Sequence, residues 1–246
     1  MKTIIIIPAR YDSTRFPGKP LADICGKPMI WWVYHQCKKV KKADLVYVAT
    51  DDERINKMCE SLSIPVIMTD KGITTSTERA YQVAKKIDAD VYVVVNGDEP
   101  LISPNEIDEI IPSERPSEGI YVRNLMTPIK NPTELIDFTN IKVVTDNKSR
   151  ALFMSRGAIP FPKSSIEYTF YKHVGVLAYN YAALEFFINH EKGKNELIED
   201  INELRYIENG VFPEMIPVEY ETLSVDTPKD LFHVQEVIRH SRNINF

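Results

Sequence analysis

Short apolar runs and amphipathic segments alternate along the first hundred residues. The runs at 4–7, 45–49, 65–68 and 90–95 are typical of strands. Ile4–Ile7 has no polar residue at alternate positions, as expected of a strand buried on both faces. Helical patterns occupy 29–37, 53–61 and 77–87. This order predicts an α/β fold with a doubly wound, mostly parallel, Rossmann-like sheet.

The pattern changes from residue 119 onward. Strand-like runs at 121–125, 141–145, 151–155 and 173–179 follow one another without regular helices between them. They predict a smaller mixed β subdomain over 119–180, which we expect to contribute substrate contacts and a dimer interface. The remaining chain predicts helices at 181–189, 195–209 and 228–241. A late strand is expected at 216–220, confined by Pro217 to a sheet edge or a strand start.

Composition narrows the class of protein. The chain has 246 residues, 43% of them hydrophobic, and a net charge of −5, which argues against general nucleic-acid binding. Its three cysteines show no CxxC spacing, and five scattered histidines complete no zinc site. The first isoleucine run ends at Pro8, too short for a signal peptide or a membrane span. We therefore expect a cytoplasmic protein.

The segment after the first strand is the most informative motif. Arg10, Arg15 and Lys19 lie beside the hydroxyls of Ser13 and Thr14, in a segment that prolines and a glycine keep irregular. Cations at the carboxyl end of a buried strand suit a triphosphate. A solvated basic loop is the alternative. The segment matches neither GxxxxGK[ST] nor GxGxxG.

Acidic residues follow the fourth strand. Asn96 and Gly97 precede Asp98, and Mg²⁺ prefers one or two carboxylates completed by phosphates and water. Asp226, far along the chain, is the candidate second carboxylate, because it stands just before a predicted helix. The alternatives are an acidic turn at Asp98 and a helix N-cap at Asp226.

Two weaker signals remain. Thr75 and Glu78 have the spacing of a capping box, and hydroxyls at a helix N-terminus also contact phosphate. Arg156 offers a forked contact to a carboxylate, and a protonated His173 can donate two hydrogen bonds to an anion. A structural role for His173 is an equal alternative.

Together these motifs resemble the 3-deoxy-manno-octulosonate cytidylyltransferase (CMP-Kdo synthetase) family, over nearly the whole chain. The opening motif and the pair of aspartates are the most specific parts. The segments that carry the resemblance are 7–21, 48–52, 77–79, 97–100, 141–144, Ser155-Arg156 with Ile159-Pro160, His173 with Gly175, 203–205 and 225–228.

The resemblance implies a single nucleotidyltransferase domain over 1–246. It would couple CTP to a 3-deoxy-2-keto sugar acid, giving a CMP-sugar for lipopolysaccharide synthesis and pyrophosphate. Lys19, Asp98 and Asp226 would be catalytic, and both aspartates would hold Mg²⁺. The implied nucleotide contacts are Pro8, Ala9, Arg10, Ser13, Arg15, Lys19, Thr75, Ser76, Arg79 and Asp98. The implied contacts to the acid are Asn96, Arg156, His173, Asn202 and Glu203. A homodimer is also implied.

The chain departs from the family pattern mainly on the acceptor side. Asn96 replaces a Gln, Leu177 replaces a Tyr, and Asn202-Glu203 replaces Glu-Gln. Ile73, Thr75 and Ser76 stand where the family has His, Ser and Gly. These changes favour a modified acceptor, such as an 8-amino octulosonate, or another small acid. A guanylyl or uridylyl transferase is disfavoured by the Pro-Ala-Arg-Tyr opening, and a non-catalytic nucleotide-binding protein is the non-enzymatic alternative.

Overall fold

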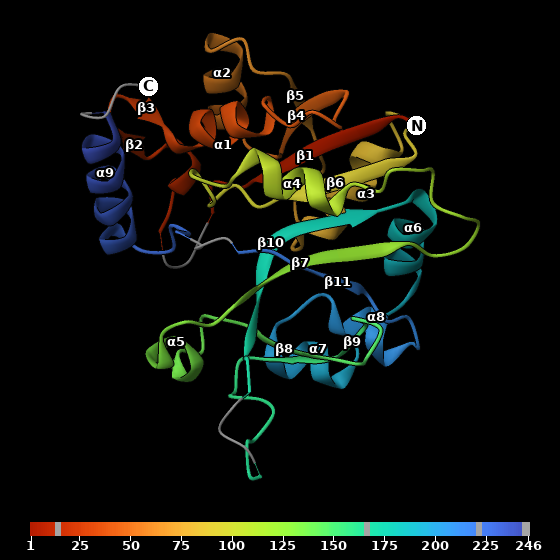
Figure 1. The fold of residues 1–246 in the computed structure, drawn as a ribbon. Helices are drawn as coiled ribbons and strands as arrows, with labels where there is room; N and C mark the ends of the chain where they lie inside the picture. The colour runs from red at the N-terminus through yellow and green to blue at the C-terminus, as the bar shows by residue number, and fades with distance from the viewer. Residues whose placement is uncertain (13–15, 165–167, 220–222, 243–246) are drawn as a thin grey trace.

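A nine-stranded sheet organises the computed structural model, which describes residues 1–12, 16–164, 168–219 and 223–242. Four parallel strands form one half of the sheet, in the spatial order β6, β1, β4, β5 (Figure 1). Their bounds are Thr3–Ala9 for β1, Leu45–Thr50 for β4, Val66–Met68 for β5 and Val91–Val95 for β6. The predicted mostly parallel α/β sheet is confirmed.

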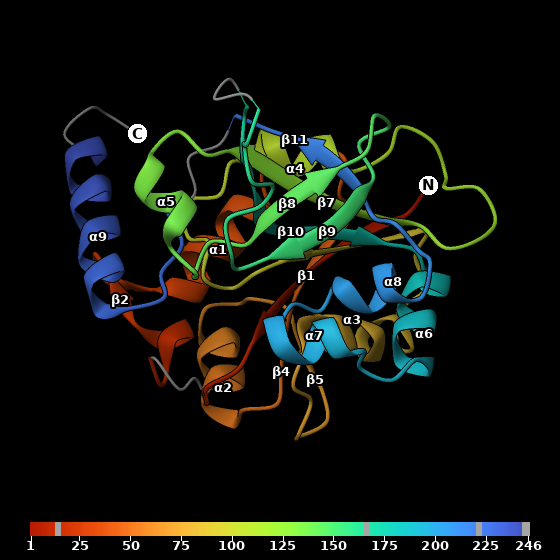
Figure 2. The same ribbon diagram turned by 90° about the horizontal axis from the view of Figure 1, so that it is seen from below.

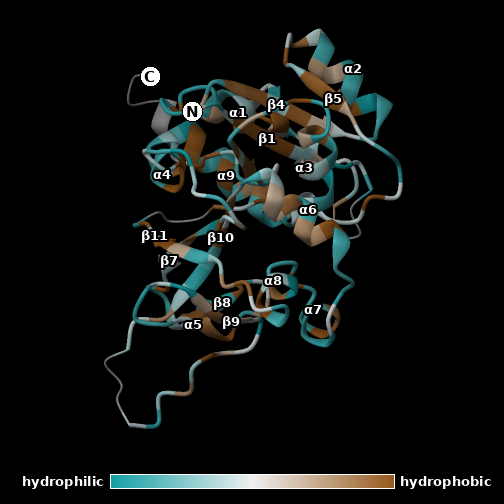
Figure 3. Ribbon diagram, turned by 90° about the vertical axis from the view of Figure 1, so that its right-hand side faces the viewer, coloured by the Kyte–Doolittle hydropathy of each residue, from teal (hydrophilic) through white to brown (hydrophobic). Residues whose placement is uncertain are grey.

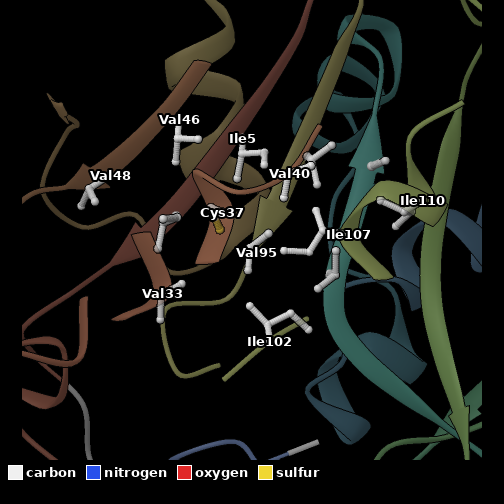
Figure 4. Close-up of a cluster of buried hydrophobic side chains, with 14 of the residues drawn as sticks. Ile5, Val33, Cys37, Val40, Val46, Val48, Val95, Ile102, Ile107 and Ile110 are labelled. Atoms are coloured by element: carbon white, nitrogen blue, oxygen red, sulfur yellow. The ribbon is translucent and has the colours of Figure 1, made fainter. Parts of the chain in front are cut away.

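Alternate residues of β1 enter two different cores. Ile5 and Ile7 pack against helices α1 (Met29–Cys37), α2 (Glu53–Ser61) and α4 (Pro104–Ile110), in the cluster drawn in Figure 4. Ile4 and Ile6 pack on the other face, against α3 (Ser76–Ala84) and α6 (Tyr181–Asn189). All four isoleucines are completely buried. Helices on both faces explain why the run contains no polar residue.

The second half of the sheet is mixed. Strand β10 (Tyr171–Tyr179) pairs antiparallel with β6 and with β7 (Val122–Pro128), and β11 (Glu214–Pro217) runs parallel to β7 at the edge. Pro217 ends this edge strand, as its missing N–H requires. The hairpin of β8 (Lys142–Thr145) and β9 (Ala151–Ser155) branches from β10 (Figure 2).

Two helical predictions in this half need correction. A short helix, α5 (Pro132–Ile136), lies between β7 and β8, where none was expected. The helix expected over 195–209 is two helices, α7 (Lys194–Glu199) and α8 (Leu204–Glu208). Asp200 separates them in a left-handed conformation with φ of 52°. Figures 1 and 3 show α5, α7 and α8 below the layer that contains β1 and β4.

The C-terminal helix returns to the beginning of the chain. Helix α9 (Pro228–Arg242) packs on the hairpin of β2 (Asp23–Ile24) and β3 (Lys27–Pro28), which follows the 3₁₀ helix η1 (Lys19–Leu21). Val234 and Ile238 of α9 join Ile24, Met29 and Val225 in one buried cluster. This packing places the residues before α9 beside the start of η1. No helix in the described part of the chain is long and apolar enough to cross a membrane.

A buried ion pair joins α6, α7 and α8. Arg205 donates to both carboxylate oxygens of Glu196, at 2.8 and 2.6 Å, and to the carbonyls of Phe187 and His190. Arg205 and Glu196 are only 4% and 2% exposed. A buried carboxylate without its partner is costly, so the pair fixes how these helices meet.

We predict that Arg205→Met lowers the free energy of unfolding by about 3–5 kcal/mol, because it strands the Glu196 carboxylate. Chemical denaturation measures the loss. Arg239→Met, which breaks the exposed Arg239–Glu236 pair, is the matched control and costs about 0–1 kcal/mol. Equal, small losses in both variants would show that the buried pair contributes little.

Candidate active site

A cavity of about 500 Å³ opens at the carboxyl ends of β1 and β6. Ligands of open α/β sheets bind at this edge. Polar and charged side chains dominate its wall. The lining residues are Pro8, Ala9, Arg10, Lys19, Pro20, Ile73, Thr74, Thr75, Ser76, Arg79, Asn96, Gly97, Asp98, Lys192, Asp200, Asn202 and Asp226.

Lys19 lies between two aspartates in this cavity. Its Nζ donates to Asp98 Oδ2 at 2.8 Å and to Asp226 Oδ1 at 3.2 Å. Burial on its own lowers the pKa of Lys19, but the two carboxylates outweigh burial and raise that pKa above its ordinary value. The ammonium therefore stays charged. The cavity thus brings together the three residues that the resemblance marks as catalytic.

Close backbone packing holds Asp98 in place. It follows β6 through Gly97, where a Cβ atom would lie 2.8 Å from the carbonyl oxygen of Pro8 at the end of β1. The Asp98 carbonyl accepts from Val225 N at 2.9 Å, which ties this turn to the segment before α9. Asp226 is not the N-cap residue of α9, because the helix begins at Pro228.

The donor set at this point fits a hard divalent cation. Asp98 and Asp226 converge on one ammonium group, so both carboxylates face the same point in the cavity. Within the described ranges, no three or more acidic, histidine or cysteine side chains gather as a complete metal cage. Two carboxylates without a cage are what Mg²⁺ takes when phosphates and water supply its other ligands.

The nucleotide side of the cavity combines the end of β1 with the start of α3. Thr75 and Glu78 form the predicted capping box: the Thr75 hydroxyl accepts from Glu78 N, and the Glu78 carboxylate accepts from Thr75 N. Arg10 reaches across and donates to the Thr74 carbonyl at 3.3 Å. Pro8, Ala9 and Ser76 also line the cavity. The predicted contacts Ser13 and Arg15 lie outside the described residues.

Arg79 borders the cavity, but its guanidinium group is already engaged. The side chain is 3% exposed, pairs with Asp51 at 3.3 Å and donates to the Thr69 hydroxyl. Arg79 therefore forms part of the cavity wall and places a positive charge just beneath the wall's surface.

On the acceptor side, Asn96 and Asn202 line the cavity, whereas Arg156 is not among its lining residues. Arg156 donates to the carbonyls of Glu199, Phe138 and Asp200, at 2.7, 3.1 and 3.1 Å. Two of its five N–H groups thus hold the backbone at the break between α7 and α8, and a third holds the segment between α5 and β8. The forked contact to a substrate carboxylate that the sequence suggested is not prepared in this arrangement.

His173 is neutral at neutral pH, so it does not offer the two N–H donors of a protonated ring. Burial, together with the positive charge of Arg156, lowers its pKa to about 4. Its Nδ1 lies 2.7 Å from Asn124 Oδ1. At neutral pH this ring therefore carries one N–H and one free lone pair.

Two further residues from the sequence analysis lie in the protein interior. Glu203 is the N-cap residue before α8, and burial, with Glu196 nearby, raises the pKa of its carboxyl to about 7. Neither Glu203 nor Leu177 is among the lining residues. Leu177 packs in the core with Tyr92 and Tyr179. Its replacement of a Tyr therefore changes a packed interior position.

Two charged residues that line the cavity were not predicted from the sequence. Lys192 follows α6, and Asp200 separates α7 from α8. Both are exposed, and Lys192 has no hydrogen bond or ion pair within the described ranges. Neither belongs to a motif, so only the tertiary fold reveals their position.

Glu99 is an acid buried beside the two aspartates. Its Oε1 accepts from the Ser224 hydroxyl at 2.6 Å, and its Oε2 has no partner among the residues that the structure describes. Burial, together with the charge of Asp98, raises the pKa of Glu99 from 4.5 to about 8. Glu99 is therefore mainly protonated at neutral pH.

We predict that Glu99→Gln raises the melting temperature more at pH 8 than at pH 5, in the absence of divalent cations. Between pH 4.5 and 8 Glu99 ionises in the unfolded chain but stays protonated when folded, so rising pH favours unfolding. Glutamine removes this penalty. Glu109→Gln, at an exposed position of α4, is the control. An equal shift at both pH values would contradict the raised pKa.

Comparison with known proteins gives a consistent assignment. A family model described as cytidylyltransferase matches residues 4–219. The 3-deoxy-manno-octulosonate cytidylyltransferase of Trichlorobacter lovleyi is 38% identical, over 96% of this chain and 98% of that protein. The 8-amino-3,8-dideoxy-manno-octulosonate cytidylyltransferase of Shewanella baltica is also 38% identical, over 94% and 96%.

Solved structures agree with this result. CMP:2-keto-3-deoxy-manno-octonic acid synthetase, solved in complex with CTP, superposes with a TM-score of 0.91 and 34% identity, covering 98% of this chain and all of that one. The inositol-1-phosphate CTP transferase of T. maritima shares the fold, with a TM-score of 0.65 at 13% identity. From its sequence and its fold, this chain belongs to the cytidylyltransferase family of nucleotidyltransferases.

Proposed function

We propose that this protein transfers the cytidylyl group of CTP to the anomeric hydroxyl of a 3-deoxy-2-keto sugar acid of the manno-octulosonate type. The observation that carries the proposal is Lys19 held between Asp98 and Asp226 in a polar cavity at the sheet edge. The two similar enzymes named above act, by their names, on acids of this type.

The reaction needs positioning and charge neutralisation more than covalent catalysis. The acceptor oxygen forms a bond to the α-phosphorus, the bond from that phosphorus to the bridging oxygen breaks, and pyrophosphate leaves while the hydroxyl proton is lost. Arg10 and Lys19 face the triphosphate in this proposal, and Thr75 and Ser76 line the nucleotide side. Mg²⁺ held by Asp98 and Asp226 would neutralise phosphate charge and favour ionisation of the attacking hydroxyl.

The acceptor side suits a polyhydroxylated acid. Asn96 and Asn202 supply donors and acceptors for hydroxyl groups, and Lys192 supplies a cation with no ion-pair partner among the described residues. Because Arg156 is bound to backbone carbonyls, we propose Lys192 as the cation nearest the acceptor's carboxylate. The two named acids differ at carbon 8, and our proposal covers the part that they share.

We predict that Asp98→Asn and Asp226→Asn each lower pyrophosphate release from CTP and octulosonate by about 100-fold or more. Changes in the partners of metal ligands already cost roughly 10–100-fold, and these variants change the proposed ligands themselves. EDTA should abolish release, and Mg²⁺ should restore it. Asp88→Asn is the matched control, because Asp88 is exposed and precedes the amino end of β6, away from the cavity.

Two results would contradict the proposal. Pyrophosphate release that persists in EDTA would show that the reaction needs no divalent metal. CTP binding without pyrophosphate release for any 3-deoxy-2-keto acid would show that the protein only binds nucleotide. Full activity of both asparagine variants would show that the aspartates serve the fold rather than the reaction.

We also propose a cytoplasmic homodimer that uses the 119–180 segment. Phe138, Leu152 and Phe161 are 70%, 49% and 85% exposed there. Large exposed apolar side chains in one segment support an interaction site there.

We predict that light scattering gives a mass of twice the 28.3 kDa chain. Phe138→Asp together with Phe161→Asp should shift the mass to that of the monomer, because buried charge opposes association. Phe232→Asp, at a 61% exposed position of α9, is the control. A dimer that survives the double change would place the interface elsewhere.

A further inference from the structure

Asn124 is a completely buried polar residue that contacts the ring of His173. It lies on β7, opposite β10, where the pairing of the two strands shifts register between His173 and Leu177. Its Nδ2 donates to the carbonyls of Val174 and Val176, both at 2.9 Å. Its Oδ1 lies 2.7 Å from His173 Nδ1.

These contacts fix the orientation of the Asn124 amide. Both Nδ2 hydrogens are used by carbonyl oxygens, which can only accept. A flipped amide would place Oδ1 against those two oxygens, which is strongly unfavourable. Oδ1 therefore faces His173 as an acceptor, and the hydrogen between the two groups must belong to Nδ1.

The tautomer of His173 follows from this orientation. A neutral imidazole with its hydrogen on Nδ1 has a bare lone pair on Nε2. The charged group that acts on the ring is Arg156, after β9, and its positive charge also opposes a second proton. The partner from β7 is the neutral Asn124. Asn124 thus places the single proton on Nδ1, and burial together with Arg156 opposes a second proton on Nε2.

His173 is not itself among the lining residues, but its strand packs on the cavity wall. Two residues further along β10, the Gly175 carbonyl accepts from Asn96 N at 2.8 Å. A Cβ atom on Gly175 would lie 2.6 Å from Asn96 Nδ2, so the strand packs directly on this lining residue. The His173 ring is half-buried, and Nε2 has no hydrogen-bond partner among the described residues.

We propose that Asn124 is a positioning residue that holds His173 in the Nδ1–H tautomer, so that Nε2 accepts a hydrogen bond from a hydroxyl of the acceptor acid. The role in substrate recognition rests on the proposed function. In this arrangement the histidine recognises a hydroxyl donor and leaves the carboxylate to a cation. Protonation of His173 would turn Nε2 into a donor and remove the contact.

The tautomer is measured directly by nitrogen NMR on the full chain labelled with ¹⁵N-histidine. We expect a protonated Nδ1 and a bare Nε2 for His173, unchanged between pH 8 and about 5, because its pKa is about 4. The spectrum of His173→Gln assigns the signal. A proton on Nε2, or titration near pH 6.5, would overturn the proposal, and neither result depends on activity.

The positioning role is tested with Asn124→Asp, which keeps an acceptor oxygen toward His173 and adds a negative charge, at the cost of the two Nδ2 hydrogen bonds to Val174 and Val176. A carboxylate beside the ring should raise the pKa of His173 by about 1–3 units. The acid limb of kcat/KM for octulosonate should move up by the same amount, while the KM for CTP stays unchanged. Asn147→Asp, at an exposed turn, is the matched control.

The outcomes separate the two proposals. An unchanged pH profile in a folded Asn124→Asp variant would overturn the positioning role. A variant that fails to fold leaves the NMR measurement on the native protein as the test. If the native protein turns over no acid at all, the proposed function fails, whatever the tautomer of His173.

Discussion

The ion trio of Lys19, Asp98 and Asp226 is the constraint on which the site depends. It joins the start of η1, the end of β6 and the segment before α9, three parts of the chain that are far apart in sequence. A mostly buried ammonium group is tolerated only with charged partners, so these segments must meet. Two contacts outside the ion trio keep the same three segments together. Helix α9 packs on the β2–β3 hairpin, and Val225 N donates to the Asp98 carbonyl.

The sheet fixes the shape of the cavity around these three residues. Strands β1 and β6 are buried on both faces, so their carboxyl ends are rigid, and Gly97 allows the following turn to pass against Pro8. The nucleotide side is built on these ends and on the capped start of α3. The acceptor side depends instead on Arg156, which holds the break between α7 and α8 from the β8–β9 branch. One side of the cavity is therefore set by local strand ends and the other by long-range contacts.

That division explains which parts the sequence could predict. The parallel strands and the capping box at Thr75 follow from local patterns that need no knowledge of the tertiary fold. The pairing of Asp98 with Asp226 is implied by the family resemblance, because the local pattern at Asp226 equally allows a helix N-cap. The break at Asp200 does not follow from a local pattern, because its left-handed backbone is stabilised by Arg156, 44 residues away. The neutral state of His173 likewise depends on burial and on Asn124 from a neighbouring strand. Lys192 belongs to no motif, and only folding brings it to the cavity.

The most direct test of the account is ³¹P NMR of the product formed from CTP, Mg²⁺ and octulosonate. We predict one new phosphodiester signal from a CMP-linked sugar, appearing together with an equal amount of pyrophosphate. Formation of free CMP and pyrophosphate at the same rate with and without the acid would show hydrolysis in place of transfer, and would contradict the account.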